Sequence, residues 1–313
     1  MTELKLYTPE NRNTWNNFIS ECKNATFLHN RGYMEYHSHR FTDSSLMAYS
    51  NGKLIAVMPA NRNGDTLYSH QGLTYGGWLI KAKHFNAVNM IEIFDEMKRF
   101  LPSIGIRKLI YKPSPHIYHS YPAEEDLYAL FRNNGTLIEC NVSSTIPLDN
   151  AIEYNYTYRK AVNTALQNNI SVIESESYER FWIILTRLLN TKYGVDPVHS
   201  LEEITLLKNR FPNNIRLFMA INTDGSPIAG TVIYDTGIVA HAQYITATDE
   251  GKANGALPLL FKHLIEKVFT ERRYFDFGIS NENHGEYLNE GLILQKSHMG
   301  GRAVVHNIYQ LTF

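Results

Sequence analysis

Polar side chains gather around residue 276, close to the end of a strand predicted over residues 273–279. Asp276 lies in this strand, and Gly278 comes just beyond it. A carboxylate at a strand end can act as a general base or orient an amine, and it can equally cap the following loop through hydrogen bonds. Further polar residues follow: Ser280, Asn281 and Asn283. The pattern therefore predicts either a polar ligand site or a hydrogen-bonded turn.

A second candidate site lies at the start of a helix predicted over residues 255–271. The preceding loop reads Lys252-Ala-Asn254-Gly255-Ala-Leu257. A helix N-terminus offers backbone amides and the positive end of the helix dipole to a phosphate. Pro258, in the first turn, removes one of those amides. The loop is thus compatible with a phosphate site and equally with an ordinary helix start flanked by glycine.

Two pairs of histidines have spacings that a metal site could use. They are His37-x-His39 and His116-x-x-His119. Neither pair has a carboxylate or cysteine partner at ligand spacing, so we predict loop or surface histidines and no metal site. The chain also lacks GxSxG, a Walker loop, GxGxxG and HExxH. These absences argue against the common hydrolases, nucleotide kinases and dinucleotide oxidoreductases.

Composition predicts an ordinary globular protein. The chain has 313 residues, of which 43% are hydrophobic and 19% charged, enough for two domains with sizeable cores. The formal net charge of -1 gives no global field that would favour DNA or an anionic membrane, although a local basic patch could still dock RNA. Cys22 and Cys140 form no disulfide framework. With no apolar signal segment and no stretch of ~20 apolar residues, we predict a cytoplasmic protein without a transmembrane segment.

The elements that would position these residues occur twice along the chain. Residues 46–60 and 218–232 each read as two strands joined by a turn, Asn-Gly in the first and Asp-Gly in the second. Each hairpin is followed by more strand, an amphipathic helix and another short strand. Such a repeat has the size of a whole domain, so we predict α/β domains at 1–150 and 151–313, packed around a cleft. Within the chain we also predict a strand over residues 73–80 and a short helix over residues 283–289.

The order of elements in the second half resembles the GNAT acyltransferase fold. In that fold a central strand leads into a loop and helix that hold a pyrophosphate, with the loop pattern Arg/Gln-x-x-Gly-x-Gly/Ala. Lys252 stands where arginine or glutamine is expected, Gly255 matches, and Leu257 occupies the last small position. The resemblance implies a mixed α/β sheet with flanking helices, and it implies that Lys252, Asn254 and Gly255 contact the donor cofactor.

Further segments are similar to the Fem-type branch of the same superfamily, which carries two GNAT domains in tandem. Downstream of residue 273, the segments are Tyr274-Phe-Asp-Phe-Gly278, Tyr287-Leu-Asn-Glu-Gly-Leu292 and Gln295-Lys-Ser-His-Met-Gly-Gly301. Tyr158-Arg-Lys-Ala161 and Gly72-Leu-Thr-Tyr-Gly-Gly77 fit the same group. The long helical arm found in many members that use aminoacyl-tRNA has no counterpart here.

This resemblance implies transfer of an acyl or aminoacyl group to an amine on a cell-envelope or glycan precursor. The donor would be an acyl-CoA or an aminoacyl-tRNA, with no permanently bound cofactor. The acceptor would be a small molecule, glycopeptide or nucleotide sugar, and tRNA is a candidate partner. The second domain would hold the donor and the chemistry, and a degenerate first domain would shape the acceptor side.

The resemblance also implies roles for individual side chains. Asp276 is the expected base or amine-orienting group, and Tyr244 the expected hydrogen-bond donor or general acid. The remaining residues are expected to contact substrate: His70, Tyr75, Ser280, Asn281, Asn283 and Lys296. A non-catalytic binding module that kept the tandem fold is the alternative, since Pro258 and Leu257 weaken the phosphate loop.

Overall fold

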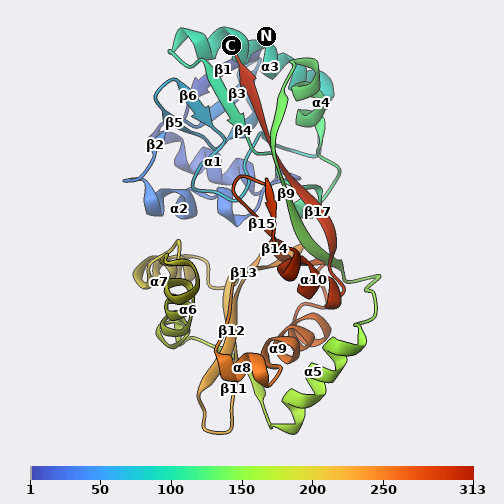
Figure 1. The fold of residues 1–313 in the computed structure, drawn as a ribbon. Helices are drawn as coiled ribbons and strands as arrows, with labels where there is room; N and C mark the ends of the chain where they lie inside the picture. Colours follow the sequence, from blue (N-terminus) through green and yellow to red (C-terminus); the bar gives the residue numbers. More distant parts are fainter. Residues whose placement is uncertain (1) are drawn as a thin grey trace. The chain divides into compact units, whose positions relative to one another are not determined.

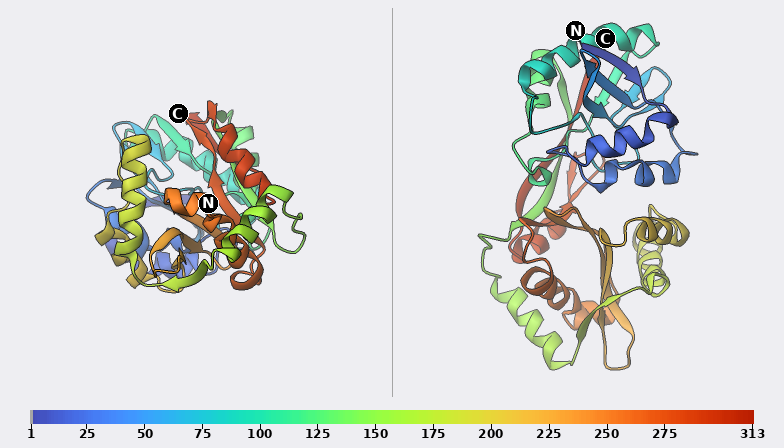
Figure 2. Two further views of the ribbon diagram at one scale, coloured as in Figure 1. Left: turned by 60° about the horizontal axis from the view of Figure 1, so that its bottom comes forward. Right: turned by 180° about the vertical axis from the view of Figure 1, so that it is seen from behind.

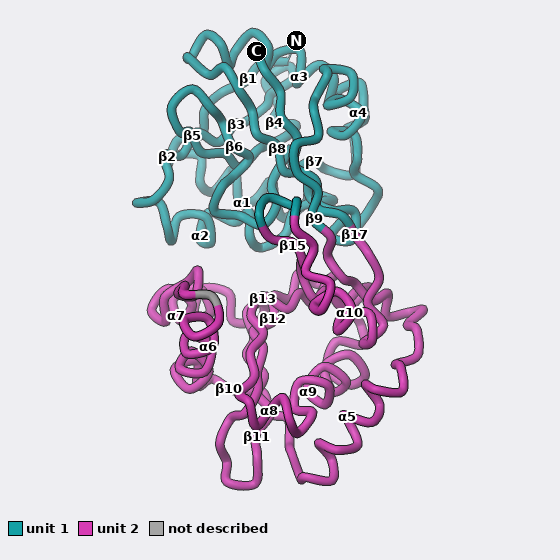
Figure 3. The backbone as a smooth tube through the Cα atoms, in the orientation of Figure 1, with its two compact units in different colours: residues 1–141, 283–286, 305–313 teal, residues 142–282, 287–304 magenta. Residues whose placement is uncertain are grey.

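The computed structural model describes residues 2–313, apart from the side chain of Tyr193. These residues form two compact units, shown in two colours in Figure 3. Unit 1 comprises the chain up to Asn141 together with residues 283–286 and 305–313, and unit 2 comprises residues 142–282 and 287–304. Each unit buries its own apolar core. The predicted division of labour between residues 1–150 and 151–313 stays a prediction.

Unit 1 surrounds helix α3 (Ala87–Ser103), whose apolar face enters the core. One sheet has the order β1-β3-β4-β7, and a second set of strands has the order β17-β8-β6-β5-β2. The strands are β1 (Thr2–Leu6), β2 (Thr42–Asp43), β3 (Leu46–Ser50), β4 (Lys53–Met58), β5 (Asn61–Asn63), β6 (Thr66–Tyr68), β7 (Leu79–Ile80), β8 (Lys108–Tyr111) and the later part of β17 (Arg302–Thr312). The other helices are α1 (Arg12–Ile19), α2 (Arg31–Met34) and α4 (Glu125–Arg132), with short turns η1 (Pro9–Asn11), η2 (Phe27–His29), η3 (Glu35–His37) and η4 (His116–Tyr118).

Unit 2 is built on strands in the order β10-β11-β12-β13-β14-β9. The strands are β9 (Thr136–Pro147), of which residues 142–147 belong to this unit, β10 (Ser171–Ser175), β11 (Ile215–Ile221), β12 (Pro227–Asp235), β13 (Val239–Ala247), β14 (Tyr274–Ile279), β15 (Asn281–Glu282) and β16 (Tyr287–Leu288). The helices are α5 (Tyr156–Gln167), α6 (Tyr178–Tyr193), α7 (Leu201–Arg210), α8 (Asp249–Ala253), α9 (Ala256–His263), the π-helical turn η5 (Leu264–Val268) and α10 (Glu290–His298).

The helices of unit 2 cover the two faces of its sheet. In Figures 1 and 2, α5 and α9 lie on one face of strands β11 to β13, and α6 and α7 lie on the other. Residues of α5 and α9 share one buried core with Ile146, Phe275 and Phe277. Side chains that alternate with these along the strands must therefore point to the face of α6.

Both predicted hairpins are present. β3 and β4 pair antiparallel from Leu46↔Met58 to Ser50↔Lys53, and β11 and β12 pair in the same way. In the first turn Asn51 and Gly52 have φ of 50° and 77°, which is the left-handed backbone that an Asn-Gly hairpin turn requires. Alternation and turn residues were sufficient signals for these strands.

Two predicted elements are wrong. Residues 283–289 form no helix, because Asn283 and His284 have φ of 52° and 55° at the tip of the hairpin formed by β15 and β16. The strand predicted over 73–80 is reduced to β7. At Gly76 a Cβ atom would lie 1.9 Å from the Ser69 carbonyl oxygen, so this glycine serves close contact between two backbones and not a ladder.

Candidate functional site

The carboxylate of Asp276 lies at the centre of a buried hydrogen-bond network in unit 2. Its Oδ1 accepts from Ser143 Oγ at 2.5 Å and from Thr145 Oγ1 at 2.8 Å. Its Oδ2 lies 2.7 Å from Nδ1 of His241. The Asp276 side chain is 0% exposed, whereas that of His241 is 12% exposed. The carboxylate is thus held from two neighbouring strands and reaches solvent only through the imidazole.

The strand pattern explains why these four residues meet. Phe275 and Phe277 enter the core under α9, so Asp276 between them points to the opposite face. Ile146 enters the same core, so Thr145 and Ser143 also point to the opposite face. His241 and Asp276 are direct partners in the parallel register of β13 and β14. Four polar side chains from three strands are therefore brought together on one face.

The parallel pairing of β13 and β14 stops at this site. Its register runs from Val239↔Tyr274 to Ala240↔Phe275 and ends at His241↔Asp276. β13 continues to Ala247, while β14 ends at Ile279 after Gly278, which has a φ of +74°. The backbone of β13 beyond His241 is consequently outside the β13–β14 ladder, at the point where the buried carboxylate is reached.

The contact to Asp276 determines what His241 can do. A carboxylate only accepts hydrogen bonds when it is ionised, so Nδ1 of the imidazole must carry the hydrogen that it shares with Asp276. In that tautomer the lone pair is on Nε2, which can take up a proton. A carboxylate that orients a histidine in this way is a recurring arrangement in general-base catalysis. The sequence prediction did not include His241.

A β-bulge places Tyr244 on the same face as His241. Val232 pairs with Tyr244 and Ile233 pairs with Ala242, so Gln243 is the extra residue in β13. Residues three apart on a regular strand face opposite sides, and the extra residue restores the same side.

Tyr244 is largely buried beneath α6. Its ring meets that of Trp182 edge-on at 5.2 Å. Its Oη lies 2.5 Å from Nδ1 of His199 and accepts from the backbone N–H of His199 at 3.2 Å. The catalytic role expected for Tyr244 stays a prediction.

Lys296, on α10, fastens the chain that follows β14. Its Nζ donates to the carbonyl oxygens of Gly278 and Ile279 at 2.7 and 2.9 Å, and to Ser280 Oγ at 2.9 Å. Burial lowers the Lys296 pKa to about 8, and the negative charge of Asp276 opposes that shift. These three contacts engage all three N–H groups of an ammonium, so they order the end of the strand. Substrate binding by Lys296 stays a prediction.

The predicted polar cluster after Asp276 is present, with different surroundings for each member. Ser280 is 2% exposed and contacts Lys296. Asn281 accepts from the backbone N–H of Val142 at 2.5 Å through Oδ1, which ties the segment to β9. Asn283 lies at the tip of the β15–β16 hairpin. Substrate contacts by these residues remain predictions.

The predicted phosphate loop forms the connection between α8 and α9. Lys252 Nζ lies 2.8 Å from Asp249 Oδ1, and Asn254 Oδ1 accepts from Nδ2 of Asn168 on α5 at 2.9 Å. Gly255 has a φ of +71°, and a Cβ there would lie 2.2 Å from the carbonyl oxygen of Ala161. Close packing against α5 is therefore sufficient to explain this glycine. Donor binding by the loop stays a prediction.

His70 and Tyr75 lie in unit 1, where both are almost fully buried. The His70 ring stacks on that of His37 with 5.5 Å between centroids, and burial lowers the His70 pKa to about 3. The Tyr75 ring packs on that of Tyr118 at 4.4 Å. Their assignment as acceptor contacts stays a prediction.

Two searches concern groups that other site classes would need. Among residues 2–313, no cluster of three or more His, Cys, Asp or Glu side chains is placed to hold a metal ion. Over the same residues, no helix combines the length and the apolar character that crossing a membrane requires.

Solved structures that match the whole chain identify the fold. FemX superposes with a TM-score of 0.68 and 10% sequence identity, covering 99% of this chain and 97% of that one. L-PGS from Bacillus licheniformis gives a TM-score of 0.61 and 12% identity, covering 98% and 92%. A tandem GNAT protein from the clavulanic acid biosynthesis pathway gives 0.52 and 10%, covering 100% and 98%.

The sequence itself matches no family model and no curated protein. The structural matches, all at low identity, show the fold alone. The predicted fold class, a mixed α/β sheet with flanking helices in a Fem-like tandem GNAT arrangement, is confirmed.

Proposed function

We propose that unit 2 catalyses transfer of an acyl or aminoacyl group to an amine, with His241 as the general base. The observation that carries the proposal is the 2.7 Å contact between His241 Nδ1 and the buried Asp276 Oδ2, at the point where β13 and β14 separate. A protonated amine is not a nucleophile, so an amine acceptor needs a base at the site of attack. The Fem-like tandem GNAT fold supports this reaction class.

In the proposed reaction, Nε2 of His241 takes a proton from the acceptor nitrogen as that nitrogen attacks the ester or thioester carbonyl. Asp276 holds the imidazole in the required tautomer and stabilises the imidazolium that forms. Of the two roles expected for Asp276, its complete burial and its bonds to Ser143 and Thr145 favour the orienting one.

The other components of the reaction come from the same strand. Backbone N–H groups of β13 beyond the His241–Asp276 pair lie outside the β13–β14 ladder, so they are the proposed donors to the carbonyl oxygen as it becomes negative. Tyr244, on the same face as His241, is the proposed proton donor to the leaving group. Lys252, Asn254 and Gly255, before α9, are proposed to contact the phosphates of the donor.

The donor is proposed to be an acyl-CoA or an aminoacyl-tRNA, and the acceptor an amine on a cell-envelope or glycan precursor. L-PGS, one of the structural matches, and FemX share the fold, and neither fixes the substrate of this chain. A cytoplasmic location follows from this proposal and not from the structure.

The test is a titration of the purified protein with acetyl-CoA, with aminoacyl-tRNA and with a UDP-linked muropeptide or amino sugar. A ligand that binds the native state raises the melting temperature by mass action. We expect one donor to do so and to yield an N-acylated amine whose formation requires His241. If a donor binds but no amide forms, the protein is the non-catalytic binding module. If no donor binds, the acyltransferase proposal is wrong.

A further inference from the structure

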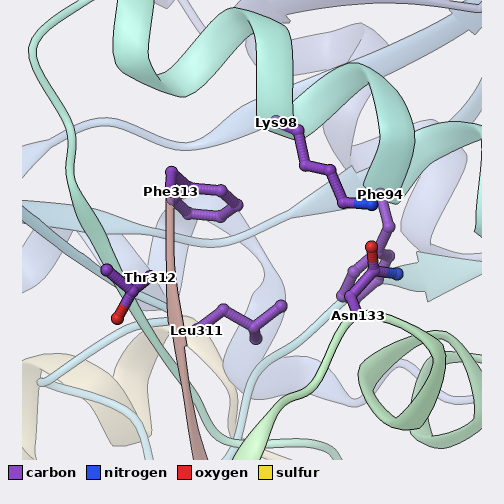
Figure 4. Close-up of a pocket in the computed structure, with 6 residues that line it drawn as sticks. All are labelled: Phe94, Lys98, Asn133, Leu311, Thr312 and Phe313. Carbon is purple, nitrogen blue, oxygen red and sulfur yellow. The ribbon is translucent and has the colours of Figure 1, made fainter.

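Unit 1 contains a pocket that has no part in the proposed transfer reaction. Its volume is about 280 Å³, and six residues from α3, the end of α4 and the end of β17 line it. Figure 4 shows them: Phe94, Lys98, Asn133, Leu311, Thr312 and Phe313. An apolar cavity of ~150 Å³ suffices for benzene, so this pocket has room for a single ring with one substituent.

The walls of the pocket are mostly apolar. Phe94 and Leu311 belong to the buried core of unit 1, and Phe313 packs against the same core. Phe94 and Lys98 lie four residues apart on α3 and therefore share one face of that helix. A ligand in the pocket would thus cover the edge of an apolar core, with a cation at one side.

One polar atom in the pocket wall has no partner within the described structure. It is Oδ1 of Asn133, which is buried and accepts no hydrogen bond. The amide cannot simply be turned around, because its Nδ2 donates to the carbonyl oxygen of Ala129 at 2.7 Å. A buried acceptor without a donor is unfavourable, so a ligand that donates to it gains affinity.

The two polar groups of the pocket have complementary demands. Lys98 Nζ, which lies 3.2 Å from Asp95 Oδ1, only donates hydrogen bonds, whereas Asn133 Oδ1 only accepts them. A carboxylate would be repelled by Asn133 Oδ1 and an ammonium by Lys98. A neutral group that both donates and accepts, such as a carboxamide or hydroxyl, satisfies both residues.

We infer that this pocket binds a small neutral ligand, an apolar ring or branched chain bearing one carboxamide or hydroxyl. A ligand of this size makes few contacts, so the dissociation constant is expected in the millimolar range. The inference rests on unit 1 alone and is independent of the function proposed for unit 2.

The test uses the full chain and three probes of equal shape: benzamide, benzoate and benzylamine. Protein chemical shifts are followed by NMR during titration. We expect saturable shifts with benzamide at residues of α3 and α4, and binding at least 5-fold weaker for benzoate and benzylamine, since each leaves one polar group unsatisfied.

Two variants assign the binding to this pocket. Asn133→Leu keeps the volume and removes the acceptor, so benzamide should bind at least 5-fold more weakly. Lys98→Leu, at an exposed position that folding does not require, should relieve the discrimination against benzylamine. The inference is overturned if benzamide gives no saturable shift, if the three probes bind equally, or if neither variant changes binding.

Discussion

Unit 1 and unit 2 each bury an aspartate beside a pair of parallel strands, with different partners. In unit 2 the partner of Asp276 is an imidazole from the neighbouring strand. In unit 1 the partner of Asp126 is a phenol: Tyr111 Oη donates to Asp126 Oδ2 at 2.8 Å and accepts from the backbone N–H of Trp78 at 2.7 Å. Burial raises the pKa of Tyr111 well above 10. The phenol therefore holds its proton at neutral pH, whereas an imidazole can exchange one.

The register of the strands makes this comparison residue by residue. In unit 1, β6 and β8 pair in parallel and the third pair is Tyr68↔Ile110, while the third pair of β13 and β14 is His241↔Asp276. An isoleucine and a tyrosine at this position offer no base. The two pairs differ in side chains and not in strand geometry, so the capacity for proton transfer depends on these two positions.

The largest effect is expected for His241→Gln, which keeps a donor within reach of Asp276 and removes the base. kcat/KM for amine acylation should fall by about 10²- to 10⁴-fold, the usual contribution of a general base. Tyr68→Phe, at the matched position of unit 1, should leave the rate unchanged. Transfer rates of both variants check the prediction, and equal losses would contradict it.

Asp276→Asn should have the next largest effect on activity. An amide in place of the carboxylate no longer fixes the imidazole tautomer, so kcat should fall by about 10- to 100-fold while KM changes little. Asp126→Asn is the matched change in unit 1 and should keep kcat. Steady-state kinetics separate the two outcomes, because a loss confined to KM would point to substrate binding instead of orientation.

The carboxyl in unit 1 should instead affect stability, in a manner that depends on pH. Burial raises the Asp126 pKa to about 7, above the ordinary value of about 3.9 for an unfolded chain. Its contribution to stability is therefore fully present below pH ~4 and is lost as pH rises through about 7. Relative to wild type, Asp126→Asn should gain on the order of 2 kcal/mol between pH 4 and pH 8.

Urea unfolding at several pH values, monitored through the transition of unit 1, measures this difference. Asp276→Asn serves as a comparison variant in the other unit. A difference between wild type and Asp126→Asn that does not vary with pH would show that the carboxyl does not titrate in this range.

The smallest effects are expected for the hydroxyls that hold Asp276. Ser143→Ala and Thr145→Val each remove one of the two donors to Oδ1, so kcat should fall by about 2- to 10-fold in each, corresponding to roughly 0.5–1.5 kcal/mol. The double variant should lose more than the product of the single losses, because the carboxylate oxygen is then left without a hydroxyl. Kinetics of all three variants test this, and strictly independent losses would argue against a shared role.

Local patterns sufficed for much of the fold. The Asn-Gly and Asp-Gly turns between alternating strands identified both hairpins, and the helical spacing of apolar residues identified α3 and α9. The sequence also selected Asp276, because a carboxylate within a strand between two phenylalanines is unusual. The helix expected over 283–289 was wrong, since the positive φ of Asn283 and His284 leaves no local sequence signature.

His241 was missed because its significance depends on a partner 35 residues away. The parallel register that joins His241 to Asp276 is set by the sheet as a whole and not by neighbouring residues. One signal was available: a histidine stands between two small apolar residues, Ala240 and Ala242, in the middle of a strand. A polar side chain at such a position needs a buried partner, which is a reason to look for one.

The division of β9 between the two units has a practical consequence for anyone who wishes to produce unit 2 separately. Its residues 142–147 complete the sheet next to β14, ahead of all the helices of that unit. A fragment that began after Pro147 would lack Ser143 and Thr145 and would leave one edge of β14 open to other chains. Expression trials should therefore start upstream of Val142, or the product will be an aggregation-prone protein with an unsupported carboxylate.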